Sequence, residues 1–540
     1  MTSLAVKTST LKEGTTSTNE LVNIVDFFQQ NIVPELQSAA AAHPILTADA
    51  IKFATTFRNQ LPKESYGAII QTLAPHLVNA QCPPVTVSYI AHCIERLLTV
   101  KDKQPDGTKV GRIAKTDLAP VLESLLGGFF SALDREDMKE NEYVMKAIMR
   151  LISFGQEALL PHVELCMGKL VAKLTAAAAN PCNPAFNHYL FETIAALVKN
   201  VCTAHPDAIA AFDGTLCPLV QHILDQDVQE FAPYVFQLMT LLLSLHSKAG
   251  HEAPAQYLAM LAPLLMPVFW ERSSYVPALV PLLVAFLKVA SAHIVAQNQV
   301  QPILGVFQKL IASKANDHHG FALLAGMVEH VPMATLQPFL TQVFQIVLQR
   351  LSTLKTHKFV RGFIVFMSIF VCKHGAAHLF STLDTVQPNI LIMLLEQVWL
   401  PGLASIQKNA DRKTSAVALI KLVTDCPSLP PSAALWNKGV AHVVPLLEST
   451  NADEAAQDEV DGLEEMSGHT AFSKLQNASV AAATSPCADV ADARQFFAQS
   501  LQKMSQGSPG QLRGLLGGSM EQVHMGLVDQ YLATYGCQLH

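Results

Sequence analysis

The sequence predicts an all-α protein built as a HEAT-repeat α-α superhelix, or alpha solenoid, and three observations support this. Half of the 540 residues are hydrophobic and only 15% are charged, so the chain can bury a large core. Apolar residues recur at the three-and-four spacing of a helix, and no stretch alternates as a strand would. Prolines recur beside the apolar runs at intervals of about 36 to about 57 residues, centred near the length of a HEAT or armadillo unit.

The recurring prolines mark one position in the repeat. A proline inside a helix removes a backbone hydrogen bond and bends the helix, so the outer helix of each pair can curve over the inner one. Because one helix pair cannot bury its own apolar face, we expect successive pairs to stack into one core with a concave groove. The series comprises Pro34, Pro75, Pro120, Pro161, Pro218, Pro263, Pro302, Pro338, Pro388 and Pro445.

Each period reads as two helices. Residues 64–78 carry one apolar stripe, the prolines at 83 and 84 interrupt it, and residues 85–100 carry a second stripe. In the next unit, Thr116 and Asp117 are expected to cap a helix that runs to Leu133. After a charged turn, residues 141–154 form the second helix of that unit.

Two stretches depart from the repeat. Residues 448–465 carry eight acidic side chains and neither Lys nor Arg, and like charges at that density oppose compaction. This stretch is either a solvated loop or a site that attracts a basic segment of a partner. Residues 505–519 are rich in Gly and Ser and predict a flexible connector before a last helix over residues 520–535.

Composition excludes several classes of protein. The 37 Lys and Arg against 44 Asp and Glu leave a net charge of -7, so no basic surface for nucleic acid is expected. The apolar runs 276–290 and 363–372 are interrupted or ended by proline or lysine before the roughly 20 residues of a membrane span, and no membrane insertion is expected. The N-terminus lacks the apolar core of a signal peptide. Ten scattered cysteines are typical of reduced thiols in a cytosolic or nuclear protein.

A search for catalytic chemistry finds little. There is no phosphate-binding loop, dinucleotide fingerprint or nucleophile elbow. The stretch from Cys372 to His378 has two histidines four residues apart. Gly375 between them weakens a helix, and no carboxylate lies between them as in a metalloprotease helix. The stretch therefore indicates an inter-helix turn and not a metal site. Asp317 could orient His318 for acid–base work, but it lies where a helix N-cap is expected. We expect no enzyme activity, no cofactor and no metal.

Three basic clusters lie at or near predicted inner helices. Each is either an ordinary solvated surface or a partner contact, and aromatic residues do not interleave with them as base stacking would require. The clusters are Lys309 with Lys314, Lys355 with Lys358 and Arg361, and Arg412 with Lys413 and Lys421.

Four long runs carry a more specific signal: FRNQLPKE at 57–64, NEYVMKAIMR at 141–150, DVQEFAPYVFQ at 227–237 and GVFQKLIASKANDHHGF at 305–321. They resemble the exportin-2 family of the importin-β superfamily, also called the cellular apoptosis susceptibility family. The similarity extends from about Thr15 to about Tyr535.

The resemblance implies a nuclear transport receptor that re-exports importin-α from the nucleus to the cytoplasm. In this family the receptor binds importin-α together with Ran-GTP, whose nucleotide is held by Ran, and it is not an enzyme. The resemblance also implies contacts with nucleoporins, shuttling between nucleus and cytoplasm, and a presence at the nuclear envelope.

The resemblance further implies that this chain corresponds to the C-terminal portion of the family sequence. Sequence similar to residues 19–23 lies in the middle of the chain in the family. The N-terminal half that carries the main Ran contact is then missing. We expect a lead-in at 1–18, a HEAT-repeat array at 19–448, an acidic and irregular segment at 449–485, and C-terminal helices with a Gly/Ser connector at 486–540.

Candidate contacts with importin-α or Ran are polar residues of predicted inner helices in the matching runs. Helix caps and hydrogen bonds between repeats are the alternative roles for the same residues. Two other functions stay open: a HEAT-repeat scaffold subunit of another complex, such as a phosphatase, and an enzyme that uses Asp317 and His318. The candidates are Lys146, Arg150, Asn187, His188, Gln229, Glu230, Lys309, Lys314, Asn316 and Asp317.

Overall fold

Paired helices make up nearly all of the computed structural model. It describes residues 23–38, 43–353, 355–426, 429–431, 433–449, 474–479, 486–507 and 509–539. The chain divides into two compact units. The first comprises Met1–Gly250 with Asp461–Ser479, and the second comprises His251–Val460 with Val480–His540.

The first unit contains four clear helix pairs after a short lead-in. We call the first helix of each pair A and the second B. The lead-in consists of α1 (Ile24–Phe27), α2 (Val33–Gln37) and α3 (Pro44–Thr56). The pairs are α4 (Lys63–Val78) with α5 (Pro84–Leu98), α6 (Lys115–Leu133) with α7 (Glu142–Gly155), α8 (Val163–Ala179) with α9 (Pro184–Ala204), and α10 (Ile209–Asp225) with α11 (Ala232–Ala249).

The second unit continues the same plan. Its helices are α12 (Ala255–Leu264), α13 (Pro267–Glu271), α14 (Val276–Ala296), α15 (Val300–Ala312), α16 (Asp317–His330), α17 (Met333–Thr353), α18 (His357–His374), α19 (Ala376–Val386), α20 (Ile390–Leu394), α21 (Leu400–Gly402), α22 (Asn409–Asp425), α23 (Ala434–Ser449), α24 (Ala493–Gly507), α25 (Leu512–Ser519) and α26 (Gln522–Thr534). Short 3-10 or π-helical turns cover Phe28–Ile32, Arg58–Gln60, Gln156–His162, Pro206–Ala208, Leu395–Trp399 and Leu403–Ser405.

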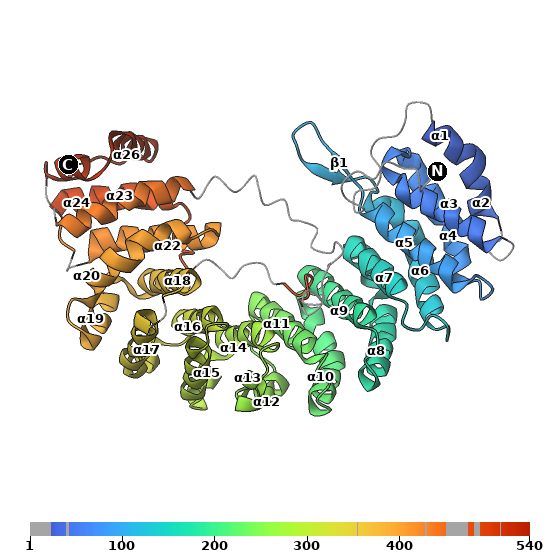
Figure 1. The fold of residues 1–540 in the computed structure, drawn as a ribbon, viewed down its shortest axis with the longest axis horizontal. Helices are drawn as coiled ribbons and strands as arrows, with labels where there is room; N and C mark the ends of the chain where they lie inside the picture. The colour runs from blue at the N-terminus through green and yellow to red at the C-terminus, as the bar shows by residue number, and fades with distance from the viewer. Residues whose placement is uncertain are drawn as a thin grey trace. The chain divides into compact units, whose positions relative to one another are not determined.

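Helices of the same kind stack on one another within each unit. In the first unit α5 packs on α7 and α7 on α9, while α4 packs on α6 (Figure 1). In the second unit the B helices α14, α16, α18, α22 and α24 pack in that order. This nearest-neighbour stacking is how a solenoid buries its core. The predicted fold class is therefore confirmed, and α6 ends at Leu133 as predicted. The predicted cap at Thr116 and Asp117 is wrong, because Ala114 is the N-cap residue of α6, although the Asp117 carboxylate accepts the backbone N–H of Ala114 at 3.0 Å.

Most of the recurring prolines lie within A helices, as predicted. Pro75, Pro120 and Pro218 lie inside α4, α6 and α10. In the second unit, α12, α17 and α23 contain Pro263, Pro338 and Pro445 in turn. The remaining four deviate: Pro34 and Pro302 lie near a helix start, Pro161 in a 3-10 turn and Pro388 between α19 and α20.

A β-hairpin departs from the predicted absence of strands. Strands β1 (Lys101–Lys103) and β2 (Lys109–Gly111) pair antiparallel between α5 and α6, with Gly107 in the turn at a φ of 87°. Arg112 fixes the hairpin by pairing with Asp102 at 2.5 Å. The strands are short, charged and largely exposed, so no apolar alternation marks them in the sequence.

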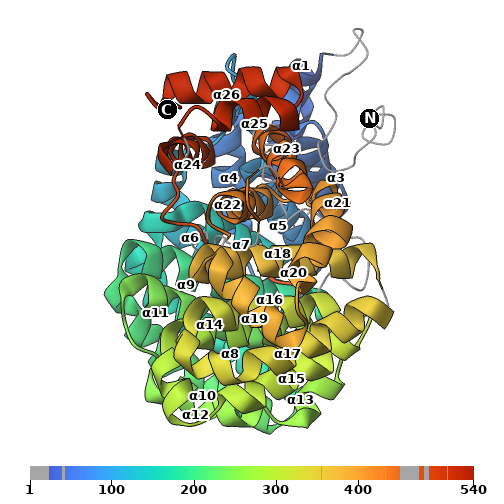
Figure 2. The same ribbon diagram turned by 90° about the vertical axis from the view of Figure 1, so that its left-hand side faces the viewer.

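The predicted Gly/Ser connector is also wrong in part. Within residues 505–519, α24 continues to Gly507 and α25 covers Leu512–Ser519. Leu512 and Leu516 are buried, and α25 packs on α23 and α26, as Figure 2 shows. The two leucines are four residues apart and so lie on one face of this Gly-rich helix. The Ser519 hydroxyl also donates to the side-chain oxygen of Asn437 on α23 at 2.9 Å. Most of the acidic stretch falls outside the described residues.

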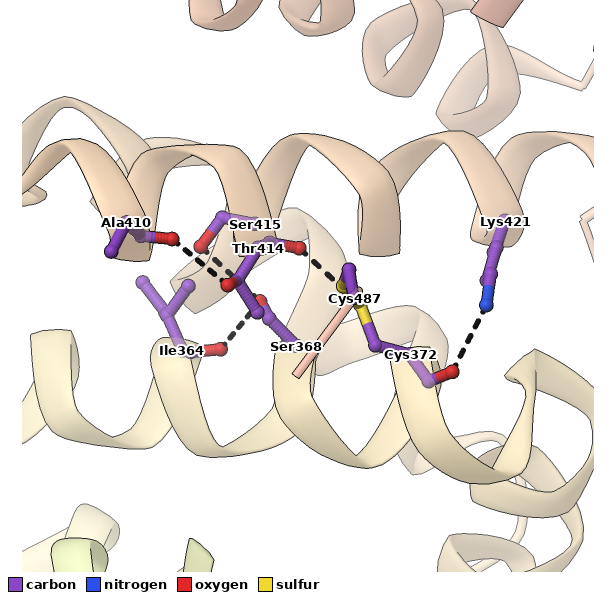
Figure 3. The surroundings of a disulfide bond; sticks show 8 residues. All are labelled: Ile364, Ser368, Cys372, Ala410, Thr414, Ser415, Lys421 and Cys487. Carbon is purple, nitrogen blue, oxygen red and sulfur yellow. Dashed lines mark hydrogen bonds between the residues drawn. A yellow bond between two sulfur atoms is a disulfide. The ribbon is translucent and has the colours of Figure 1, made fainter. Parts of the chain in front are cut away.

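A disulfide joins Cys372 at the end of α18 to Cys487, in the turn before α24 (Figure 3). The expectation that all ten cysteines are reduced is therefore wrong for these two. They lie 115 residues apart in the chain, and only the fold brings their Cα atoms to 5.9 Å. The other eight cysteines are outside the disulfide, and all of them except Cys182 are buried.

The longest apolar run forms α14. Among the described helices, α14 is long and apolar enough to cross a membrane by length and composition. About half of that apolar window is buried inside the protein, as expected for a core helix. The kink at Ala290, whose φ is -128°, interrupts the regular helix.

Candidate protein-binding site

The B helices of the first unit share a row of buried charges. Glu95 of α5 is 1% exposed and binds Arg150 of α7 at 3.1 Å, with Arg96 at 3.2 Å from its other oxygen. Burial alone would raise the pKa of Glu95, but the charges of Lys146, Arg96 and Arg150 outweigh it and lower that pKa. The carboxylate therefore stays ionised and holds α5 and α7 together.

Lys146 extends this row toward α9. Its ammonium lies 5.3 Å from the centre of the Tyr189 ring, and it is almost fully buried. Asn187 and His188 of α9 are buried too, and His188 lies 3.8 Å from the carboxylate of Glu192. The structure thus brings Lys146, Arg150 and His188 onto adjacent B helices, as the sequence placed them, but inside contacts between repeats.

Glu192 of α9 is a functional candidate that the sequence analysis missed. Its side chain is fully buried, and its two oxygens accept the backbone N–H groups of Gln476 and Asn477 at 2.5 and 2.9 Å. Burial raises the pKa of Glu192, against the effect of these hydrogen bonds. A carboxylate four residues after His188 in an otherwise apolar helix was the available signal, but nothing in the sequence indicates what it binds.

Gln229 and Glu230 lie apart from that row, on the exposed turn between α10 and α11. Gln229 donates a hydrogen bond to Asp227 at 3.2 Å, and Asp227 has the unusual φ of 47°. Both side chains are placed where a partner could reach them.

In the second unit, too, some candidate residues are exposed and others are buried. Lys309 on α15 is 45% exposed and lies 3.9 Å from Glu271, and Lys314 lies on the exposed turn before α16. Asp317 is only 1% exposed and lies 4.0 Å from Arg350 of α17. Asn316, and not Asp317, occupies the N-cap position of α16, and its side chain makes no cap hydrogen bond. The predicted capping role of Asp317 is therefore wrong.

The histidines beside Asp317 are poor candidates for acid–base chemistry. His318 lies 4.0 Å from Asp317, beyond hydrogen-bond distance. Burial lowers the pKa of His319 to about 4, helped by the charges of His318 and Lys358. A base of that pKa is far from the neutral range in which general bases work best.

The Cys372–His378 stretch and the basic cluster of Arg412, Lys413 and Lys421 have structural roles within the protein. Gly375 joins α18 to α19 at a φ of 86°, which confirms the predicted inter-helix turn. Among the described residues, no group of three or more His, Cys, Asp or Glu could hold a metal ion. Lys421 donates to the carbonyl of Cys372 at 2.9 Å (Figure 3), and Lys413 donates to the carbonyl of Ala491. Arg412 likewise donates to the carbonyl of Ile406.

A surface cavity of about 370 Å³ lies between α4 and α6, and none of the ten candidate contact residues lines it. Its lining includes Lys63, Tyr66, Arg112 and Leu118. Arg112 also donates to the Tyr66 hydroxyl at 3.0 Å, so this cavity borders the foot of the β-hairpin.

Comparisons with known proteins agree with this architecture. The family model described as "CAS/CSE protein, C-terminus" matches residues 95–531, and the model "Cse1" matches residues 1–94. Exportin-2 of Danio rerio is 39% identical over 548 residues, covering 100% of this chain and 55% of that protein. Exportin-2 of Homo sapiens is 39% identical over 541 residues, again with 55% of that protein covered. The chain therefore spans about half the length of the curated relatives it matches.

Solved structures give the same result. The exportin Cse1 in its cargo-free, cytoplasmic state superposes with a TM-score of 0.80 at 28% identity, over 98% of this chain and 53% of that one. Importin beta in an ammonium sulfate condition superposes with a TM-score of 0.58 at 10% identity, which shows a shared fold alone.

Proposed function

The chain belongs to the CAS/CSE family, and from this membership we propose that it acts in nuclear transport as part of an exportin. The proposed cargo is importin-α, bound together with Ran-GTP in the nucleus and released in the cytoplasm. Nucleoporins are the proposed further partners during shuttling through the nuclear envelope. The chain itself would bind and carry without catalysing a reaction.

The match to Cse1 over nearly the whole chain is the observation that carries this proposal. The buried charge network of Glu95 with Arg150 and Lys146 sets the packing of successive B helices. We propose that these buried residues shape the binding face. The exposed Gln229, Glu230, Lys309 and Lys314 are the proposed direct contacts. The HEAT array at 19–448 is proposed to carry the binding.

Titration calorimetry of this chain with importin-α tests the proposal. Importin-α should bind this chain directly. Coupling to Ran loaded with a non-hydrolysable GTP analogue, at least about 5-fold in affinity over GDP, is expected once the half of the relatives' length that this chain does not span is also present. Charge reversal by Lys309→Glu and Lys314→Glu should weaken the complex. Lys52→Glu, an exposed lysine on α3, is the matched control. No binding of importin-α by this chain would contradict the proposal.

A further inference from the structure

Residues 474–479, which we call the strap, dock on α9 and α11 although about 240 to 285 residues of chain separate them from their contacts. Figure 1 draws the strap as a short orange-red segment beside α9. By its contacts the strap belongs to the first unit, while His251–Val460 and Val480–His540 belong to the second. Hydrogen bonds to side chains of α9 and α11 hold the strap at this place on the first unit.

Three consecutive backbone N–H groups of the strap are bound by side chains. The Gln237 Oε1 atom of α11 accepts from Leu475 at 2.8 Å, and the two Glu192 oxygens accept from the next two residues. Gln237 is itself held in place because its amide donates to the carbonyl of Pro233 at 2.8 Å. These acceptors bind backbone N–H groups, so this part of the recognition does not depend on the side chains of the peptide.

Side chains of the strap supply the selectivity. Leu475 and Ala478 are buried, at 2% and 6% exposed, so an apolar residue and a small residue are needed at these positions. Asn477 donates its amide to the main-chain oxygen of Glu192 at 3.4 Å. A turn closes the strap, since the Ser479 N–H donates to the carbonyl of Gln476 at 3.1 Å. Lys199 then donates to the carbonyl of Ser479 at 3.2 Å.

The site is built to hold such a segment. Glu192 is fully buried in α9, and an ionised carboxylate is costly to bury without several donors. The strap provides those donors. Without a bound segment the carboxylate would lose the backbone N–H groups that compensate its burial, so a peptide of similar shape has a prepared place to bind.

We propose that α9 and α11 form a binding site for a short peptide segment, and that the strap is its resident, displaceable ligand. A partner would compete by presenting an apolar side chain followed by a turn with consecutive free backbone N–H groups and an Asn. Because the strap is tethered to the same chain, its effective concentration at the site is high, and the competing segment must overcome it. The site does not depend on the transport function proposed above.

The test uses a fluorescent peptide of residues 472–480 and the full chain with strap residues 474–479 replaced by Gly and Ser. This strap-replaced chain should bind the peptide roughly 10-fold or more tightly than the unmodified chain, in which the tethered strap competes. Adding Glu192→Gln to the strap-replaced chain should remove most of that binding. Glu164→Gln, at an exposed residue of α8, is the matched control and should leave it unchanged. Equal peptide binding by the two chains would overturn the proposal.

Hydrogen exchange on the unmodified chain gives a second measurement that does not need the strap replacement to fold. The amides of Leu475, Gln476 and Asn477 should be protected, and Glu192→Gln should speed their exchange while α9 itself stays protected. Exchange at these three amides that is as fast as in the free peptide would overturn the proposal. Neither measurement contains importin-α or Ran, so each can fail independently of the transport proposal.

Discussion

Glu95 lies between three cations, and its removal should be costly. Glu95→Gln keeps the shape of the side chain but leaves Arg150, Arg96 and Lys146 without their buried counter-charge. Removing one partner of a buried ion pair costs about 3–5 kcal/mol in free energy of unfolding. Urea unfolding monitored by circular dichroism measures the loss. Glu123→Gln, on the exposed face of α6, should change the same free energy by less than about 0.5 kcal/mol.

His319 should make the protein less stable in acid. Its pKa is lowered from 6.5 to about 4 in the folded protein, so between these values the unfolded state binds a proton that the folded state does not. The stabilisation is complete above pH 6.5 and is lost as the pH falls toward 4. Allowing for solvent screening of this half-buried group, the loss is about 1–2 kcal/mol.

His319→Gln removes the titrating group and should make unfolding free energies at pH 7 and pH 4.5 more alike than in the unmodified protein. Urea titrations at both values supply the comparison. An unchanged difference between the two pH values would show that other groups, such as His330, whose pKa is also lowered to about 4, account for the acid sensitivity.

At the scale of the helices, close packing of B helices depends on particular glycines. A Cβ atom at Gly362 of α18 would lie 2.7 Å from the Phe321 ring of α16. Gly362→Ala should therefore destabilise the protein by about 1–3 kcal/mol through overpacking. Gly305 of α15 has nothing within 4 Å of its Cβ position, so Gly305→Ala should instead stabilise by about 0.5–1 kcal/mol. Thermal unfolding of the two variants should shift in opposite directions.

The disulfide fastens the C-terminal helices to α18. A thiol titration of the denatured, unreduced protein should count the eight cysteines outside the disulfide, and all ten should react after reduction. Cys487→Ser should lower the free energy of unfolding by about 2–4 kcal/mol, because the bond closes a long loop. The melting temperature of that variant should no longer respond to reductant. Cys182→Ser, at an exposed free thiol, is the control; an equal effect there would contradict this account.

Across the whole molecule, the sequence predicted what depends on local pattern. The stripe from Tyr66 to Leu77, the end of α6 at Leu133 and the prolines of the A helices follow from nearest-neighbour packing, which produces a periodic sequence. Contacts between residues far apart in the chain produce no such periodic pattern in the sequence. Cys487 forms a disulfide with Cys372, and the strap hydrogen-bonds to Glu192, because the fold brings together parts of the chain that are far apart in sequence. The spacing of residues along the sequence does not predict such contacts. Partner contacts on Gln229 or Lys309 depend on a second molecule and stay predictions.

A solenoid should also confine the effect of a mutation to its neighbourhood, since each repeat contacts only the adjacent ones. In hydrogen exchange of the Glu95→Gln variant, protection should fall in α5, α7 and α9 and be kept in α16 and α18. The charge network ends at α9, whereas the second unit has its own buried contacts, such as Asp317 with Arg350. Equal loss of protection in both units would mean that the chain unfolds as one cooperative body and would contradict the additive energetics expected of stacked repeats.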